Sequence, residues 1–105
     1  MIIDWDASVD KTGSEKLTQQ LFSMLPESLT EDHEHLILSL HEGDMSKARQ
    51  IIHKITGGLS YCPCPEYSSA LEEIQEQLHQ DTMPQNFMKL NKAFHRVLSA
   101  LEHME

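Results

Sequence analysis

His53 is the residue of this sequence best suited to chemistry, because it stands on the polar side of an expected helix. Between Asp44 and Pro65 the apolar residues recur at helical spacing and span an arc of roughly 100–120°; they are Ala48, Ile51, Ile52, Ile55, Leu59 and Cys62. His53 lies about 140° from the centre of this arc, so its ring should face water. A neutral imidazole has a free ring nitrogen at pH 7, which can attack phosphorus and later release the phosphoryl group.

Two glycines set His53 apart from the other six histidines of the chain. Gly57 lies one turn after His53 on the same polar side, and Gly58 follows it. Each glycine inside a helix costs up to about 1 kcal/mol relative to alanine. One interpretation is that they end the helix at a C-cap. The apolar period continues to Cys62, however, and therefore favours bare backbone that lets another macromolecule come close.

Charge is distributed unevenly along the chain. Seventeen acidic and eight basic residues give a net charge of −9, which argues against a nucleic-acid backbone or an anionic membrane as the partner. The segment from Asp44 to Tyr61 is nevertheless locally basic, with Lys47, Arg49 and Lys54. These cations would suit a phosphoryl group in transit and an acidic partner surface, and Arg49 lies one turn before His53. An ordinary solvated helix face is the alternative.

Other chemistries find little support in the sequence. Neither the histidines nor Cys62 and Cys64 have the spacing of a zinc site, so no metal is expected. A disulfide across one residue would be strained, which favours a reduced pair. There is no phosphate-binding glycine loop, and the chain should have no ATP site of its own. No apolar run approaches the roughly 20 residues of a membrane span and no signal peptide is recognisable, so we expect a cytoplasmic location.

Helical periodicity predicts an all-α, up-down four-helix bundle in a single domain. Residues 1–11, with Ile2, Ile3 and Trp5, should form a flap or short extra helix, and residues 12–105 the bundle. Thr12 to Glu15 has the pattern of a capping box before the first long helix. Pro26 should interrupt that helix, with Glu27 and Ser28 opening another. The expected inward residues of this pair are Leu17, Leu21, Met24 and Leu25, then Leu29, Leu36, Ile37 and Leu40.

The remaining boundaries follow from caps and prolines. Gly43 should close the preceding helix and Asp44 should cap the histidine helix, which should finish near Tyr61 because Pro63 follows. Pro65 and Pro84 fit the first turns of the last two helices. Their expected inward residues are Tyr67, Ala70, Leu71, Ile74 and Leu78, and then Phe87, Leu90, Phe94, Val97, Leu98 and Leu101, the longest stripe.

The segment around His53 resembles a known family. His53-Lys-Ile-Thr-Gly57-Gly58 is similar to the His-x-Leu-Lys-Gly-Ser/Ala motif of histidine phosphotransfer (HPt) domains, and the stretch from Ile52 to Pro65 looks like the HPt domain of BarA/LetS-type hybrid sensor kinases. The Ile3-Asp4-Trp5 start and the Leu25-Pro26-Glu27 junction fit the same family. Thr56 stands where the family usually has lysine.

This resemblance implies a phosphorelay. His53 would accept a phosphoryl group from the aspartate of one receiver domain and pass it to a response-regulator aspartate, and Mg²⁺ would belong to the receiver. The chain would be a monomeric carrier rather than an enzyme, although a hybrid sensor containing it would be a histidine kinase. The residues expected to contact the phosphoryl group or the receiver are Arg49, Gln50, Lys54, Thr56, Gly57, Gly58 and Ser60.

Two other interpretations remain. The domain can be a helical receiver-binding module that is not phosphorylated. It can also be the dimerisation and phosphoacceptor domain of an ordinary histidine kinase, but that class usually has an acid directly after its histidine, where this chain has Lys54.

Overall fold

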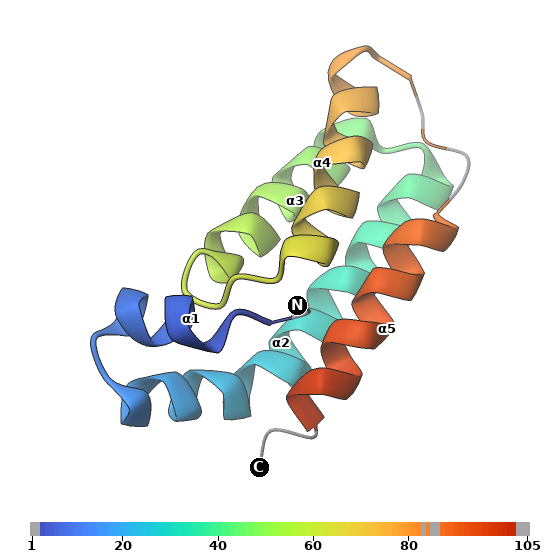
Figure 1. The fold of residues 1–105 in the computed structure, drawn as a ribbon. Coiled ribbons are helices and arrows are strands. Elements are labelled where there is room, and N and C mark those ends of the chain that lie inside the picture. The colour runs from blue at the N-terminus through green and yellow to red at the C-terminus, as the bar shows by residue number, and fades with distance from the viewer. Residues whose placement is uncertain (1–2, 83, 85–86, 103–105) are drawn as a thin grey trace.

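Four long helices pack side by side and a fifth, short helix lies across one end. The computed structural model describes residues 3–82, 84 and 87–102. The helices are α1 (Trp5–Thr12), α2 (Glu15–Glu42), α3 (Met45–Leu59), α4 (Pro65–His79) and α5 (Met88–Glu102). Around the bundle α2 lies between α3 and α5, and α4 lies between the same two helices (Figure 1). The expected four-helix bundle with an additional N-terminal helix is therefore confirmed.

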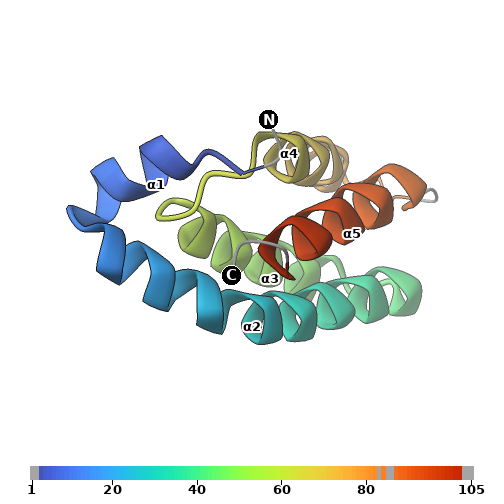
Figure 2. The ribbon, with the colours of Figure 1, turned by 60° about the horizontal axis from the view of Figure 1, so that its bottom comes forward.

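Helix α1 is tied to the bundle at its N-terminal end. The Asp4 side chain caps α1 by accepting from the Ala7 amide at 3.0 Å, while the Asp4 amide donates to the Pro63 carbonyl at 2.9 Å. The Trp5 ring packs edge-on against Phe22 of α2, with the ring centroids 5.4 Å apart. Figure 2 shows α1 crossing the end of the bundle next to the α3–α4 loop. The N-terminal segment is thus a helix rather than a flap; Ile2 lies outside the described residues.

The expected break at Pro26 is wrong, because α2 is one helix of 28 residues that contains this proline. Pro26 has no amide hydrogen to donate one turn back, and a proline inside a helix costs about 3 kcal/mol. Burial of Phe22, Leu25 and Leu29 on either side offsets this cost. The helix changes direction in this region (Figure 1), as helices usually do at proline. As a result, α2 rather than the last helix is the longest.

Several other boundaries and positions differ from expectation. Ser14, not Thr12, caps α2, since its hydroxyl accepts from the Leu17 amide, while Thr12 ends α1. Leu17 and Met24 are 52% and 71% exposed, and Thr18 and Phe22 take the inward positions. Helix α5 begins at Met88 rather than at Pro84. The expected caps Gly43 and Asp44 and the start of α4 at Pro65 are confirmed.

His33 lies buried in the middle of the bundle within a hydrogen-bonded network. Its ring stacks on Phe94 with the ring centroids 3.9 Å apart. Nδ1 lies 2.9 Å from the Tyr67 hydroxyl, and Nε2 lies 2.8 Å from Asn91 Oδ1. With Nε2–H donating to Asn91 and the Tyr67 hydroxyl donating to Nδ1, the neutral ring satisfies all these groups. Burial lowers the pKa of His33 below 6.5, against the opposing effect of the Asn91 hydrogen bond.

This network predicts acid sensitivity. Because the pKa of His33 is lower in the folded state, the unfolded chain binds its proton first as the pH falls. The contribution to stability is complete above about pH 6.5 and declines below it until the folded ring also protonates. Urea midpoints measured from pH 7.5 to 5 should therefore fall for the wild type. The His33→Gln variant should show a smaller slope than His79→Gln, which removes an exposed imidazole; equal slopes would contradict this assignment.

Candidate functional site

His53 projects from the outer face of α3 into solvent. Its neighbours Ile52 and Ile55 are 0% and 2% exposed and fix this face of the helix against the core, which turns His53 outward. Within the described part of the chain no hydrogen bond or ion pair occupies the His53 ring. The outward imidazole that the sequence predicted is confirmed, and its ring nitrogens are open to a partner.

Gly57 and Gly58 lie inside α3 and do not terminate it. The helix runs to Leu59 with Ser60 as its C-cap, and the left-handed glycines among the described residues are Gly13 and Gly43. The C-cap interpretation of the two glycines is therefore wrong. A Cβ atom built on either glycine would meet nothing within 4 Å. Neither the backbone conformation nor internal packing requires glycine here, so the bare backbone beside His53 faces outward.

The open space predicts that alanine stabilises α3 at these positions. Gly57→Ala and Gly58→Ala should each raise the free energy of unfolding by about 0.5–1 kcal/mol, because alanine loses less conformational entropy in a helix. Urea denaturation monitored by circular dichroism measures the change. Gly43→Ala is the matched control, and it should destabilise because Gly43 has φ +76°. A loss of stability on Gly58→Ala would reveal a structural need for glycine.

The cations near His53 are engaged with other groups of the bundle. Lys54 Nζ lies 3.0 Å from Asp32 Oδ1 of α2. Arg49 donates to the Leu78 carbonyl at the end of α4 at 2.8 Å and lies 3.4 Å from Asp81 Oδ1. Arg49 is thus held toward α4, whereas Lys54 leans toward α2. The structure brings Gln50, Thr56, Gly57, Gly58 and Ser60 to the exposed surface of α3 or its cap.

A hollow between α2 and α3 lies beside the glycines. It is lined by Leu25, Ser28, Leu29, Asp32, Lys54, Ile55, Gly58 and Leu59. Large exposed apolar side chains occur nearby in the sequence, with Met24 preceding Leu25 and Tyr61 following the α3 cap, and they are 71% and 54% exposed. The surface beside His53 therefore combines an open nucleophile, bare backbone and a hollow with a partly apolar lining.

Asp32 is the residue of this site that the sequence reasoning missed. It is the one carboxylate among the described residues that is buried, at 8% exposure. Its spacing of three after Leu29 and four before Leu36 puts a carboxylate at an apolar position of the α2 stripe. That mismatch in the pattern is a signal in the sequence that could have identified it.

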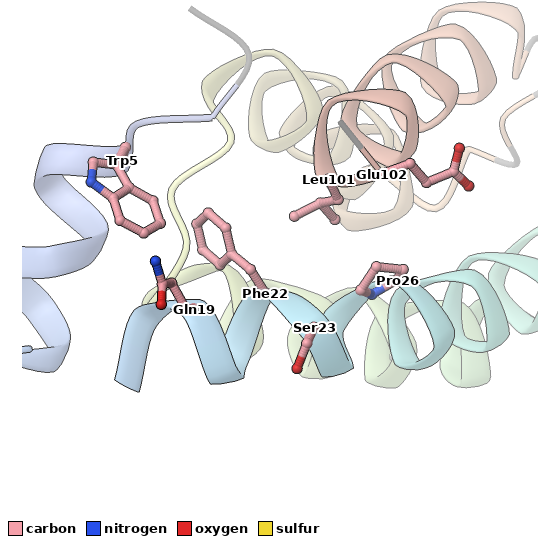
Figure 3. Close-up of a pocket in the computed structure, with 7 residues that line it drawn as sticks. All are labelled: Trp5, Gln19, Phe22, Ser23, Pro26, Leu101 and Glu102. Carbon is pink, nitrogen blue, oxygen red and sulfur yellow. The ribbon is translucent and has the colours of Figure 1, made fainter. Parts of the chain in front are cut away.

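A pocket on another part of the molecule lacks comparable chemistry. It opens between α1, α2 and α5 and is lined by Trp5, Gln19, Phe22, Ser23, Pro26, Leu101 and Glu102. Figure 3 shows the Trp5 and Phe22 rings next to one another, with Ser23 and Glu102 pointing away from them. No cluster of three metal-binding side chains occurs among the described residues, where Cys62 and Cys64 are free and buried. None of the described helices is long and apolar enough to cross a membrane.

Comparison with solved structures identifies a protein of the same fold. The HPT domain from the Hpt sensor hybrid histidine kinase from Shewanella has a TM-score of 0.79 to this chain, with 25% sequence identity. The match covers 94% of this chain and 89% of that chain. No family model matches the sequence, and no curated protein matches it. The resemblance to HPt domains inferred from the residues around His53 is confirmed by this structural match.

Proposed function

We propose that this chain, which has the HPt fold, is a phosphotransfer module of a two-component phosphorelay. His53 would accept a phosphoryl group from a receiver aspartate and pass it to a response-regulator aspartate. The observation that carries the proposal is an outward imidazole with bare helical backbone one turn away. That combination costs helix stability and gains nothing for internal packing, so access by a partner explains it best.

The reaction at His53 is a reversible transfer between two nucleophiles. A lone pair on a neutral ring nitrogen attacks the phosphorus of an aspartyl phosphate, an N–P bond forms, and the P–O bond breaks to leave a carboxylate. In the second step another aspartate attacks the phosphorus and the imidazole leaves. Nothing is oxidised or reduced, and no ATP is consumed at this domain, which would act as a carrier rather than an enzyme. If the chain is part of a hybrid sensor, the kinase activity would belong to another domain of that protein.

The partner of this surface would be a receiver domain with an acidic phosphorylation pocket. Mg²⁺ would be held by that pocket and not by this chain. Gly57 and Gly58 would admit the receiver backbone, while Gln50, Thr56 and Ser60 would contact it through polar groups. Lys54, paired with Asp32, would lie close to the phosphoryl group, and Arg49, tethered at α4, would line the edge of the interface. We further propose that the domain acts as a monomer in the cytoplasm, without nucleic acid or direct membrane contact.

Transfer of label from a phosphorylated receiver tests this function. The expected product is a phosphohistidine, which is labile to acid and stable to base, in contrast to an aspartyl phosphate.

Thr56, in place of the lysine usual in HPt domains, favours a second candidate function, that of a receiver-binding module that is not phosphorylated. Receiver binding without label on wild-type protein, for every receiver of the same cell, would support this second candidate.

A further inference from the structure

Burial of the Asp32 carboxylate costs free energy, and the stability of the bundle does not explain its presence. It is the one buried carboxylate among the described residues of a chain with 17 acidic side chains. Taking a carboxylate out of water is costly even when it is paired, and replacing such a pair by apolar residues is often neutral or stabilising. Leu29 and Leu36 are buried on the same face of α2, so an apolar side chain would also fit at position 32. Stability is therefore a weak reason for the presence of Asp32.

The partner of Asp32 connects it to the phosphotransfer site. Asp32 Oδ1 lies 3.0 Å from Nζ of Lys54, the residue directly after His53. The two side chains differ in exposure, 12% for Asp32 and 71% for Lys54. Asp32 is thus a fixed anion in the α2–α3 seam, whereas Lys54 is a long, exposed cation that can turn from the seam toward the surface.

A phosphoryl group on His53 would compete with Asp32 for this cation. The group carries up to two negative charges and three acceptor oxygens, which attract a nearby ammonium strongly. Arg49 is held by the Leu78 carbonyl and Asp81, which leaves Lys54 as the nearest cation in sequence that can respond. While Lys54 remains on Asp32, the phosphoryl group on His53 is less stabilised, and its transfer onward is easier.

We propose that Asp32 is a positioning residue that withholds Lys54 from the phosphoryl group and keeps phosphorylated His53 poised to donate. This inference rests on the proposed phosphotransfer at His53. A carrier must both accept and release its cargo, and a cation fixed on the phosphoryl group would trap it. The contact between Asp32 and Lys54 sets the balance between these two requirements.

The test compares Asp32→Asn, Lys54→Gln and the double variant. With a phosphorylated receiver, Asp32→Asn should raise the equilibrium ratio of phosphohistidine to aspartyl phosphate by about three- to tenfold, because Lys54 becomes free. Lys54→Gln should change the ratio much less, because Asp32 already withholds Lys54 in the wild type, and the double variant should behave like Lys54→Gln alone. Glu73→Gln is the matched control, since it removes a carboxylate paired with Lys89 at 2.7 Å between α4 and α5. It should leave the ratio unchanged.

Two results would overturn the inference. One is that Asp32→Asn leaves the equilibrium ratio of phosphohistidine to aspartyl phosphate at its wild-type value. The other is an Asp32→Asn effect that persists undiminished in the Lys54→Gln background, since a structural role would act without Lys54. Should Asp32→Asn fail to fold, Asp32→Ser replaces it in both backgrounds, and an equilibrium ratio that this change leaves at the wild-type value would be equally decisive.

A second readout separates this inference from the proposed function. The small phosphoryl donor phosphoramidate can modify His53 without any receiver, and peptide mapping identifies the modified residue. The lifetime of the resulting phosphohistidine should be longer in Asp32→Asn than in the wild type, and this difference should vanish in the Lys54→Gln background. If receivers fail to label the wild type, the relay proposal fails, whereas equal lifetimes in this assay would reject the role of Asp32.

Discussion

His53→Gln abolishes phosphorylation of this domain by a phosphorylated receiver. Glutamine keeps a polar side chain of similar reach but has no ring nitrogen able to attack phosphorus, so the acid-labile, base-stable label should fall to background, a loss of at least about a hundredfold. His53 is exposed on α3, and the substitution should leave the unfolding midpoint within the small range of surface changes. Radiolabel on the domain after incubation with the receiver measures the result.

His79→Gln provides the control for this experiment. His79 is also exposed, and it ends α4, the helix next to α3, so it tests whether any surface imidazole serves as acceptor. Its label should equal that of the wild type. Persistent label on the His53→Gln protein would mean that another of the seven histidines is the acceptor, and the proposed site would then be wrong.

Gly57→Glu should block transfer while leaving the fold intact. The reacting nitrogen and phosphorus must approach to about 3–3.5 Å, and a long side chain one turn from His53 would hold the receiver backbone away. We expect a rate at least about a hundredfold lower than in the wild type. A Cβ atom at Gly57 meets nothing within 4 Å, and glutamate favours helix more than glycine, so circular dichroism and thermal stability should not decline.

Two further substitutions at this position separate size from charge. Gly57→Gln has the size of glutamate without its charge and should block transfer nearly as well if obstruction is the cause. Gly57→Ala should slow transfer much less than either of these, because its methyl group is small. If the glutamine variant transfers normally and only the glutamate variant is slow, repulsion of the acidic receiver is the cause instead. Normal transfer by both would remove the argument for close docking.

The sequence determined those features that depend on neighbouring residues along one helix. The apolar period of α3 is regular and is bounded by the cap Asp44, so the outward direction of His53 followed from its angle to Ile52 and Ile55. Pro65 likewise determined the start of α4, since proline suits the first turn of a helix. The family resemblance around His53 then indicated the fold.

Tertiary packing decided what local patterns leave open. Burial of Phe22 and Leu29 carries α2 through Pro26, and contact with α1 turns Phe22 inward while Met24 stays exposed. The pairing of Lys54 with Asp32 joins two residues 22 positions apart, and no helical period predicts which cation a buried carboxylate will meet. Such contacts depend on how two helices are placed against each other. That placement minimises exposed apolar surface over the whole bundle, and it is not encoded in any one segment.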